Sequence, residues 1–256
     1  MANSQPGLPL FYNQLEPLSS GTHGSWKARR LESAPFLAQA HAVPITIEEF
    51  SLVQRNFPII FSAGENPVPL ALMGLNEGVN VFVDEKGVPN SEIYVPAYVR
   101  RYPFMLARLR SDSEDLSLCF DPTAGAIGPF EDGDGLFDGT EPTETTKNIL
   151  GFCEQFEQSA MTTGAFVKEL IDHKLLIDGE VAIQPDGAPQ PFVYRGFQMI
   201  SEDAVRNLRG DVVRKMIQSG MLPLIYAHLF SLSLIREVFG RQLAQGKIPA
   251  NQPVEA

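Results

Sequence analysis

The first half of the chain carries short apolar runs bounded by turn residues, a pattern typical of strands. These runs cover residues 58–63, 68–75, 79–83, 104–109 and 116–120. The first three follow one another closely and predict consecutive antiparallel strands, and the last two flank a charged turn at 112–115. The sequence therefore predicts a strand-rich N-terminal half.

Two short helices are expected among these strands. Thr46 and Glu49 have the three-residue spacing of a capping box, and they predict a helix that continues to about Arg55. Pro96 suits a first helical position, whereas Pro103 cannot lie inside a helix. About two helical turns therefore fit between these prolines.

In the second half the apolar residues recur every 3.6 positions, which is the period of an amphipathic helix. Residues 149–176 predict two helices or one bent helix. A small hairpin is expected next, with strands at 180–183 and 191–197 around a turn at 185–187. A pair of helices then closes the chain from about Ser201 to Gln242, with Ser201 as the N-cap and Gly220 ending the first helix.

These elements predict an α+β fold in which an antiparallel-strand-rich N-terminal half packs against a helical C-terminal half. A single domain is expected over residues 15–243, strand-rich at 15–128 and helical at 140–243, between tails at 1–14 and 244–256. Of the 256 residues, 44% are hydrophobic, which is enough for a sizeable core.

Residues 221–235 carry no formal charge when His228 is counted as neutral. A membrane-spanning helix needs roughly 20 predominantly apolar residues, and this run is shorter. The hydroxyl groups of Ser231 and Ser233 weaken that interpretation further. We therefore expect a buried core helix and no membrane span.

The formal net charge of −11 argues against nucleic acid and anionic membranes as partners, because both require clustered Lys and Arg. The N-terminus has neither the basic nor the apolar segment of a secretory signal. Cys119 and Cys153 belong to no paired motif and are expected as buried, reduced thiols. The expected location is the cytoplasm.

The signatures of common enzymes are absent: the sequence has no Walker A loop, no Gly-x-Ser-x-Gly elbow and no His-Glu-x-x-His pair. The catalytic candidates are His228 and Ser231, because positions three apart share a helical face and could bring imidazole and hydroxyl together. A core histidine satisfied by a hydrogen bond is the favoured alternative. No cofactor is expected.

Residues 94–104 combine aromatic side chains with two guanidinium groups. Arg100 and Arg101 could bind a carboxylate or phosphate as a bidentate fork, with Tyr94 and Tyr98 as further ligand contacts. The favoured alternative pairs one arginine with an internal acid and uses the tyrosines to fill the core. Trp26, the only tryptophan, could be an interface anchor or a core residue, and the core is the commoner place.

The acidic loop at 131–139 suggests a calcium site, because hard cations take several oxygen ligands from a flexible turn. Its candidate ligands are Asp132, Asp134 and Asp138. In either EF-hand register, Leu136 stands where an acidic residue or Asn is required. A solvated surface loop is therefore favoured, and no metal is expected.

Five segments of the chain resemble, in the same order, the bacterial SapC family. They are residues 57–61, 74–84, 94–104, 136–138 and 222–232. The most specific is Tyr-Val-Pro-Ala-Tyr-Val-Arg-Arg-Tyr-Pro-Phe at 94–104, and the resemblance extends from about Leu15 to Leu243. The chain departs from the pattern at Val88, where the resemblance leads us to expect a Trp.

The resemblance implies a link with bacterial surface layers, with TonB-dependent outer-membrane receptors and with cupin-like or halogenase-like enzymes. It supplies no catalytic residues. We therefore expect a cytoplasmic accessory or binding protein, whose partner is a protein or a small-molecule ligand. The alternatives are a surface-layer structural protein and an enzyme that acts with an oxygenase- or halogenase-type neighbour through a pocket of Arg100, Arg101 and His228.

Overall fold

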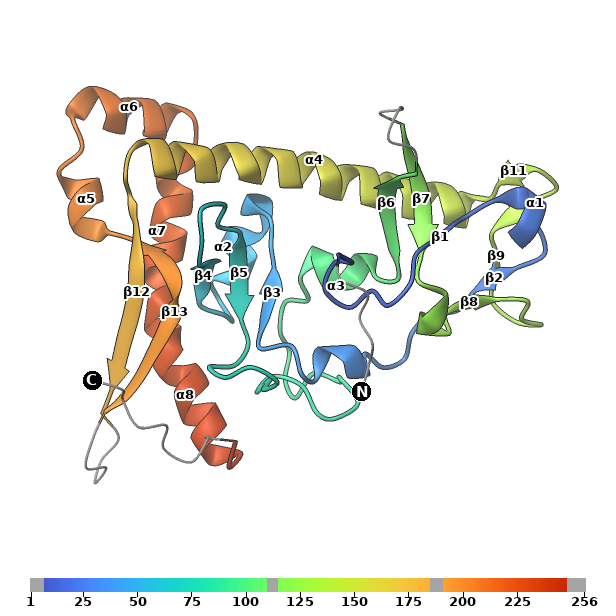
Figure 1. Cartoon of the computed structure of the whole chain (residues 1–256), viewed down its shortest axis with the longest axis horizontal. Helices are drawn as coiled ribbons and strands as arrows, with labels where there is room; N and C mark the ends of the chain where they lie inside the picture. The colour runs from blue at the N-terminus through green and yellow to red at the C-terminus, as the bar shows by residue number, and fades with distance from the viewer. Residues whose placement is uncertain (1–6, 110–114, 185–190, 248–256) are drawn as a thin grey trace. The chain divides into compact units, whose positions relative to one another are not determined.

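The computed structural model describes residues 7–109, 115–184 and 191–247 (Figure 1). Antiparallel sheets in the N-terminal half and helices in the C-terminal half confirm the predicted α+β class. The described chain forms two compact units. Unit 1 draws on residues 1–34 and 97–158, and unit 2 draws on 35–96 and 159–256.

Unit 1 is built on a three-stranded antiparallel sheet in the order β1–β7–β6. Its strands are β1 (Glu16–Pro17), β6 (Phe104–Arg108) and β7 (Leu116–Phe120). The predicted strands at 104–109 and 116–120 are therefore confirmed, and they pair with each other. The turn predicted at 112–115 falls largely outside the described residues.

Short elements surround this sheet in unit 1. They are α1 (Ser20–His23), β2 (Lys27–Ala28), α3 (Ala97–Arg101), η3 (Pro122–Ala124), β8 (Ile127–Gly128), β9 (Asp134–Gly135), β10 (Phe137–Asp138) and β11 (Glu141–Pro142). Strand β2 lies between β8 and β9, and β10 pairs with β11. The short helix predicted between the two prolines is α3.

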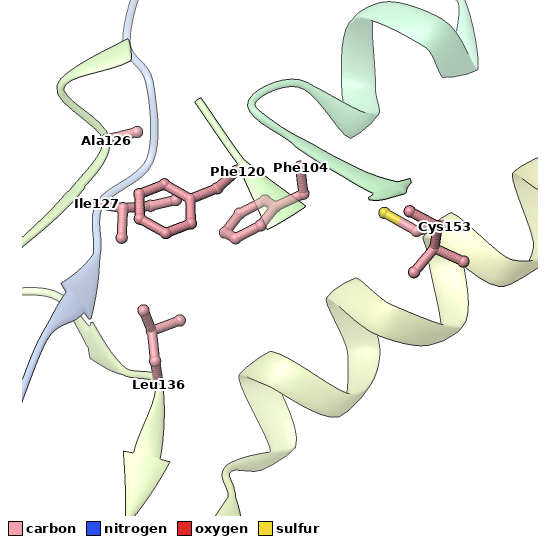
Figure 2. Packing of buried hydrophobic residues seen from close by; sticks show 7 residues of the cluster. Phe104, Phe120, Ala126, Ile127, Leu136 and Cys153 are labelled. Carbon is pink, nitrogen blue, oxygen red and sulfur yellow. The ribbon is translucent and has the colours of Figure 1, made fainter. Parts of the chain in front are cut away.

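The core of unit 1 forms between the β6–β7 hairpin, β8 and the first half of α4 (Glu144–Asp172). Figure 2 shows Phe104 and Phe120 of the hairpin beside Ile127, with Cys153 reaching in from α4. Full burial of one such aromatic side chain stabilises a protein by roughly 1.5–3 kcal/mol. This cluster therefore fixes the hairpin against the first half of α4.

Helix α4 is one continuous helix of 29 residues, drawn as the long rod in Figure 1. It ends at Asp172 rather than at the predicted 176. Lys174 adopts a left-handed φ of 54°, and Leu175 donates its N–H to the carbonyl of Leu170 at 2.9 Å. This is the hydrogen bonding of a Schellman C-cap, and it turns the chain directly into β12 (Leu176–Ile183).

Unit 2 contains a five-stranded antiparallel sheet in the order β12–β13–β4–β5–β3. Its other strands are β3 (Ala42–Pro44), β4 (Ile59–Ser62), β5 (Pro69–Leu72) and β13 (Phe192–Ile200). The strands predicted at 58–63 and 68–75 are confirmed as β4 and β5, and the predicted hairpin is confirmed as β12 and β13. The turn of that hairpin at 185–187 lies outside the described residues.

Helical segments complete unit 2. They are η1 (Pro35–Leu37), η2 (Ile47–Glu49), α2 (Phe50–Val53), α5 (Glu202–Arg206), α6 (Gly210–Gln218), α7 (Met221–Ser231), η4 (Leu232–Leu234) and α8 (Ile235–Ala244). The predicted capping box is present, because the Glu49 carboxylate accepts the N–H of Thr46 at 2.8 Å. The helix that it begins ends at Val53 rather than at Arg55.

The predicted pair of closing helices is divided into α5 and α6, and into α7, η4 and α8. Ser201 caps α5 as predicted, accepting the N–H of Ala204 at 3.2 Å, and Gly220 takes the predicted left-handed conformation. The first helix breaks at Arg209, whose ψ of 144° is extended. The second tightens into η4 directly after Ser231.

Residues 79–83 do not form the predicted strand, and the described chain has only an isolated bridge there. Val81 donates its N–H to the carbonyl of Met73 at 2.9 Å, and side chains satisfy other backbone groups. The Asn80 side chain accepts the N–H of Phe82 at 2.9 Å, and Gln245 donates to the carbonyl of Val81 at 2.9 Å. The apolar alternation in this segment therefore reflects burial and not strand pairing.

The end of α8 holds this same part of unit 2. Buried Gln242 accepts the N–H of Leu75 at 3.0 Å, and the ammonium group of Lys247 donates to the carbonyl of Asn80 at 2.9 Å. Without these contacts, the N–H of Leu75 and the carbonyl of Asn80 would need other hydrogen-bond partners. Gln242, Gln245 and Lys247 together form a C-terminal latch on this segment.

By length and composition, residues Met221–Ala244 are the one helical stretch of the described chain that could cross a membrane. A core helix passes the same test, so the finding alone does not distinguish the two. The stretch contacts α2, α6, β4 and β13, and it buries His228, Ser231 and Gln242, although Phe230 on its outer face is 69% exposed. The contacts and the buried polar groups favour a core helix.

Candidate functional site

The candidate residues divide between the two units. Unit 1 contains Trp26, Tyr98, the two arginines and the three aspartates, whereas unit 2 contains Tyr94, His228 and Ser231.

His228 and Ser231 lie together on the buried face of α7, each at most 1% exposed. The Ser231 hydroxyl donates to the backbone carbonyl of His228 at 2.7 Å and accepts the N–H of Ile59 at 2.8 Å. The imidazole Nε2 of His228 accepts the N–H of Ile200 at 3.0 Å. Both side chains therefore bind the backbone of β4 and β13, and the hydroxyl proton does not point at the imidazole.

The environment of His228 holds its imidazole neutral. Burial lowers the pKa of His228 to about 4, against a smaller opposing effect of the backbone of Ile59. Because Nε2 accepts a hydrogen bond, the proton of the neutral ring is on Nδ1. Within the described residues Nδ1 has no hydrogen-bond partner. Phe61 packs on the ring, with centroids 5.2 Å apart.

The arginines of α3 stack on aromatic rings of α4. The guanidinium carbon of Arg100 lies 5.2 Å from the ring centre of Phe152, and that of Arg101 lies 4.1 Å from the ring centre of Phe156. Phe152 and Phe156 are one helical turn apart on α4, so adjacent arginines reach successive turns. These contacts attach α3 to α4 through cation–π interactions.

Arg101 is the buried member of the pair, with a side chain only 5% exposed. Its Nη1 donates to Glu157 at 3.1 Å, and its guanidinium carbon lies 4.6 Å from the ring centre of Tyr98. Among the described residues its Nε–H has no hydrogen-bond partner. Glu157 is the internal acid that one sequence interpretation required, and the open Nε–H is compatible with the ligand interpretation.

Burial also acts on the groups around Arg101. It raises the pKa of the Cys153 thiol to about 11, against the opposing effect of Arg101, so this thiol is protonated at neutral pH. Burial likewise raises the pKa of Tyr98, which the positive charge of Arg101 partly offsets. The Cys153 sulfur is therefore a core group and not an activated nucleophile.

Trp26 is half-buried in unit 1 and packs against its core cluster. Its ring centre lies 4.5 Å from that of His23. The buried imidazole of His23 accepts the N–H of Ser19 at Nδ1 and donates from Nε2 to Glu16 at 3.0 Å. The spacing of these residues in the sequence gave no indication of this histidine–carboxylate pair.

Tyr94 contributes to the packing of unit 2. Its hydroxyl donates to the buried carboxylate of Glu49 at 3.0 Å, and its N–H donates to the side chain of Asn56 at 3.0 Å. Glu49 thus serves both the capping box and Tyr94. The first of these roles was predicted from the spacing of Thr46 and Glu49, whereas the second was not predicted.

The three aspartates of the acidic loop are exposed and serve different elements. Asp132 forms an ion pair with Arg29, and the hydrogen bond from Arg29 lowers the pKa of that carboxyl. Asp134 lies in β9 and Asp138 in β10. The described residues contain no group of three or more His, Cys, Asp or Glu side chains placed to hold a metal ion.

Comparison with known proteins gives a family but no characterised relative. No curated protein and no solved structure matches this chain. A family model described as SapC matches residues 18–238, a range that includes all five segments on which the resemblance was based. The chain belongs to the SapC family.

Proposed function

We propose that the chain is an accessory or binding protein linked to surface-layer or TonB-dependent outer-membrane uptake systems. The observation that carries this proposal is the hydrogen bonding of His228 and Ser231. Their side chains are buried and bind the backbone N–H groups of Ile200 and Ile59. A nucleophile and its base must reach a substrate, whereas this pair stabilises a helix against a sheet.

The arginine pair of unit 1 supports recognition in preference to proton transfer. A guanidinium group stays protonated at any ordinary pH, so Arg100 and Arg101 are unsuited to acid–base catalysis. Their planar, charged donors suit the binding of an anionic group. We therefore propose a protein partner or a small-molecule ligand. Nucleic acid is a disfavoured partner because the net charge is −11. We further propose that the chain is located in the cytoplasm.

The test is to purify the tagged chain from its own host under native conditions, with and without cross-linking, and to measure its mass by native mass spectrometry. The proposal predicts a bound ligand, or a co-purified protein that sequencing assigns to a surface-layer or outer-membrane uptake system. The Ser231→Ala variant is a matched control, because it should retain the same partner. Recovery of neither partner nor ligand in both preparations would contradict the proposal.

Two further measurements separate the alternatives. If the chain is an enzyme that uses the imidazole, His228→Gln should abolish a host-dependent activity without changing the melting temperature. A surface-layer structural protein predicts that cell fractionation finds the chain on the cell exterior. Either result would replace the accessory-protein proposal.

A further inference from the structure

In unit 1, residues 10–13 form a strap that lies against α3 and the β6–β7 hairpin. The hydroxyl of Tyr98 donates to the carbonyl of Leu10 at 2.9 Å. The hydroxyl of Tyr12, itself a strap residue, donates to the carbonyl of Phe104 at 2.7 Å. The strap therefore includes residues that the sequence assigned to an N-terminal tail.

Aromatic side chains make the other contacts of the strap. The ring centre of Phe11 lies 5.8 Å from that of Tyr98, and the ring centre of Tyr12 lies 5.2 Å from that of Tyr102. Phe11 has a φ of 79°, a left-handed conformation that is strained for a residue with a bulky side chain. The strap is thus held by hydrogen bonds and rings but carries backbone strain.

Arg101 lies beside the strap. Its guanidinium carbon is 4.6 Å from the ring centre of Tyr98, which binds the strap from the same helix. The Phe11 ring of the strap also packs on Tyr98, and the Tyr12 ring packs on Tyr102, the residue that follows Arg101. The strap and the open Nε–H of Arg101 are therefore joined through Tyr98 and its neighbour Tyr102.

A buried N–H without a partner is unfavourable, and such a group in a native protein calls for an explanation. The donor of Arg101 is charged, its side chain is 5% exposed, and Glu157 takes only Nη1. A carboxylate at Nε would form a charge-assisted hydrogen bond, which is stronger than the neutral bonds that hold the strap. The ligand best suited to this donor is therefore an anion.

We propose that the strap covers a binding site for an aromatic carboxylate. When the strap opens, the Nε–H of Arg101 binds the carboxylate, and the ring of the ligand takes the place of the Tyr12 ring against Tyr102. The present occupant indicates the fit, because it is an aromatic side chain of this chain itself. Release of the strained Phe11 backbone favours the exchange.

An aromatic carboxylate can come from two sources: a free aromatic acid, or an aromatic residue at the carboxyl end of a polypeptide. Both present a ring a few bonds from a carboxylate. This site goes beyond the proposed function, and it does not depend on a link to surface layers or uptake systems.

The test uses the full chain and follows the arginine Nε–Hε signals by nitrogen-15 NMR. The probe is 3-phenylpropanoate, and its matched neutral control is 3-phenylpropanamide. The Arg101 signal is the one that disappears in Arg101→Lys. If this variant does not fold, through-bond correlation assigns the signal instead. The Arg101 signal should shift when the acid is added and should not shift with the amide. Acetate, which has the charge without the ring, should bind at least tenfold more weakly.

Two variants should strengthen binding without removing the anchor. Tyr98→Phe keeps the ring beneath the guanidinium but loses the bond to Leu10, so affinity for 3-phenylpropanoate should rise about fivefold, the factor for one hydrogen bond. Glu157→Gln removes the competing carboxylate and should raise affinity at least as much. Glu154→Gln, which changes an exposed acid on the same helix, should leave affinity unchanged.

Two results would overturn the proposal. The first is an Arg101 signal that the acid shifts in none of the three proteins, namely the wild-type chain, Tyr98→Phe and Glu157→Gln. The second is an Arg101 signal that the acid and the amide shift equally. A tetrapeptide ending in Phe decides between the sources. Tighter binding of its free carboxylate form than of 3-phenylpropanoate, with no binding of its amide, identifies a polypeptide terminus. Binding of 3-phenylpropanoate alone identifies a free acid.

Discussion

Acidification from pH 7 to pH 4 should weaken the folded protein through one buried side chain, His228. Burial lowers its pKa to about 4, below the ordinary value of 6.5 that applies to the unfolded chain. Protonation would also replace the acceptor at Nε2 by a donor that faces the N–H of Ile200. The folded protein therefore resists a proton that the unfolded chain accepts readily.

The sign and size follow from this difference. Between pH 6.5 and pH 4 the unfolded chain binds more protons at this residue, so the free energy of unfolding falls as the pH falls. The contribution of His228 is fully present above about pH 6.5 and is lost progressively down to about pH 4. The full loss is ~3 kcal/mol, a large share of the roughly 5–15 kcal/mol that stabilises most proteins.

The assay is urea unfolding followed by circular dichroism at several pH values between 7 and 4, on the wild-type chain and on His228→Gln. Glutamine can accept the same backbone N–H but does not titrate. Carboxylates titrate equally in both proteins, so the difference between the two pH profiles isolates the imidazole. The wild-type chain should lose ~3 kcal/mol more than the variant. Parallel profiles would refute the reasoning about burial.

Four further stability changes should follow from local hydrogen bonding and packing. Ser231→Ala should lower the free energy of unfolding by about 1–3 kcal/mol, because a buried N–H of β4 loses its hydrogen-bond partner. Its control is Ser233→Ala at an exposed hydroxyl, which should change the free energy of unfolding by less than about 0.5 kcal/mol. Gln242→Ala should cost about 1–3 kcal/mol in the same urea assay, and a wild-type midpoint would show that the C-terminal latch is unimportant. Gly179→Ala should lower the free energy of unfolding by about 1–3 kcal/mol, because the new Cβ would clash with the ring of Phe197. Gly151→Ala places its Cβ in open space on α4, so it should raise the free energy of unfolding by about 0.5–1 kcal/mol and with it the melting temperature.

Hairpins were the most predictable part of this fold. The pairs β4–β5, β6–β7 and β12–β13 each join neighbouring apolar runs, so a local pattern is enough to identify them. The position of β13 beside β4 was not predictable, because its partners Gln198 and Phe61 are far apart in the sequence. No local pattern encodes such a long-range pairing.

Two errors have a common physical cause. Residues 79–83 alternate like a strand, but side chains such as that of Gln245, far along the sequence, satisfy part of their backbone in place of a strand partner. The closing helices have helical periodicity throughout, but the extended backbone at Arg209 interrupts the first. Periodicity reports which side chains are buried, and it does not report which groups complete the backbone hydrogen bonds.

The candidate site was predictable to a similar extent. Spacing alone placed His228 and Ser231 on one helical face, and the structure finds them there. Their partners on β4 and β13 could not be inferred, because strand residues distant in sequence supply them. The same holds for Arg101: an internal acid was an open possibility, but its identity as Glu157 and the open Nε–H depend on how α3 lies on α4.

The C-terminal latch has a consequence for the order in which the chain folds during synthesis. Unit 1 has all of its residues once the ribosome has added residue 158, so it can fold while translation continues. Unit 2 begins at residue 35, yet its segment at 75–81 gains its side-chain partners only when Gln242, Gln245 and Lys247 leave the ribosome. The earlier half of unit 2 therefore waits, incompletely folded, for nearly the whole remaining chain, and during that interval it is the part most exposed to chaperones and proteases.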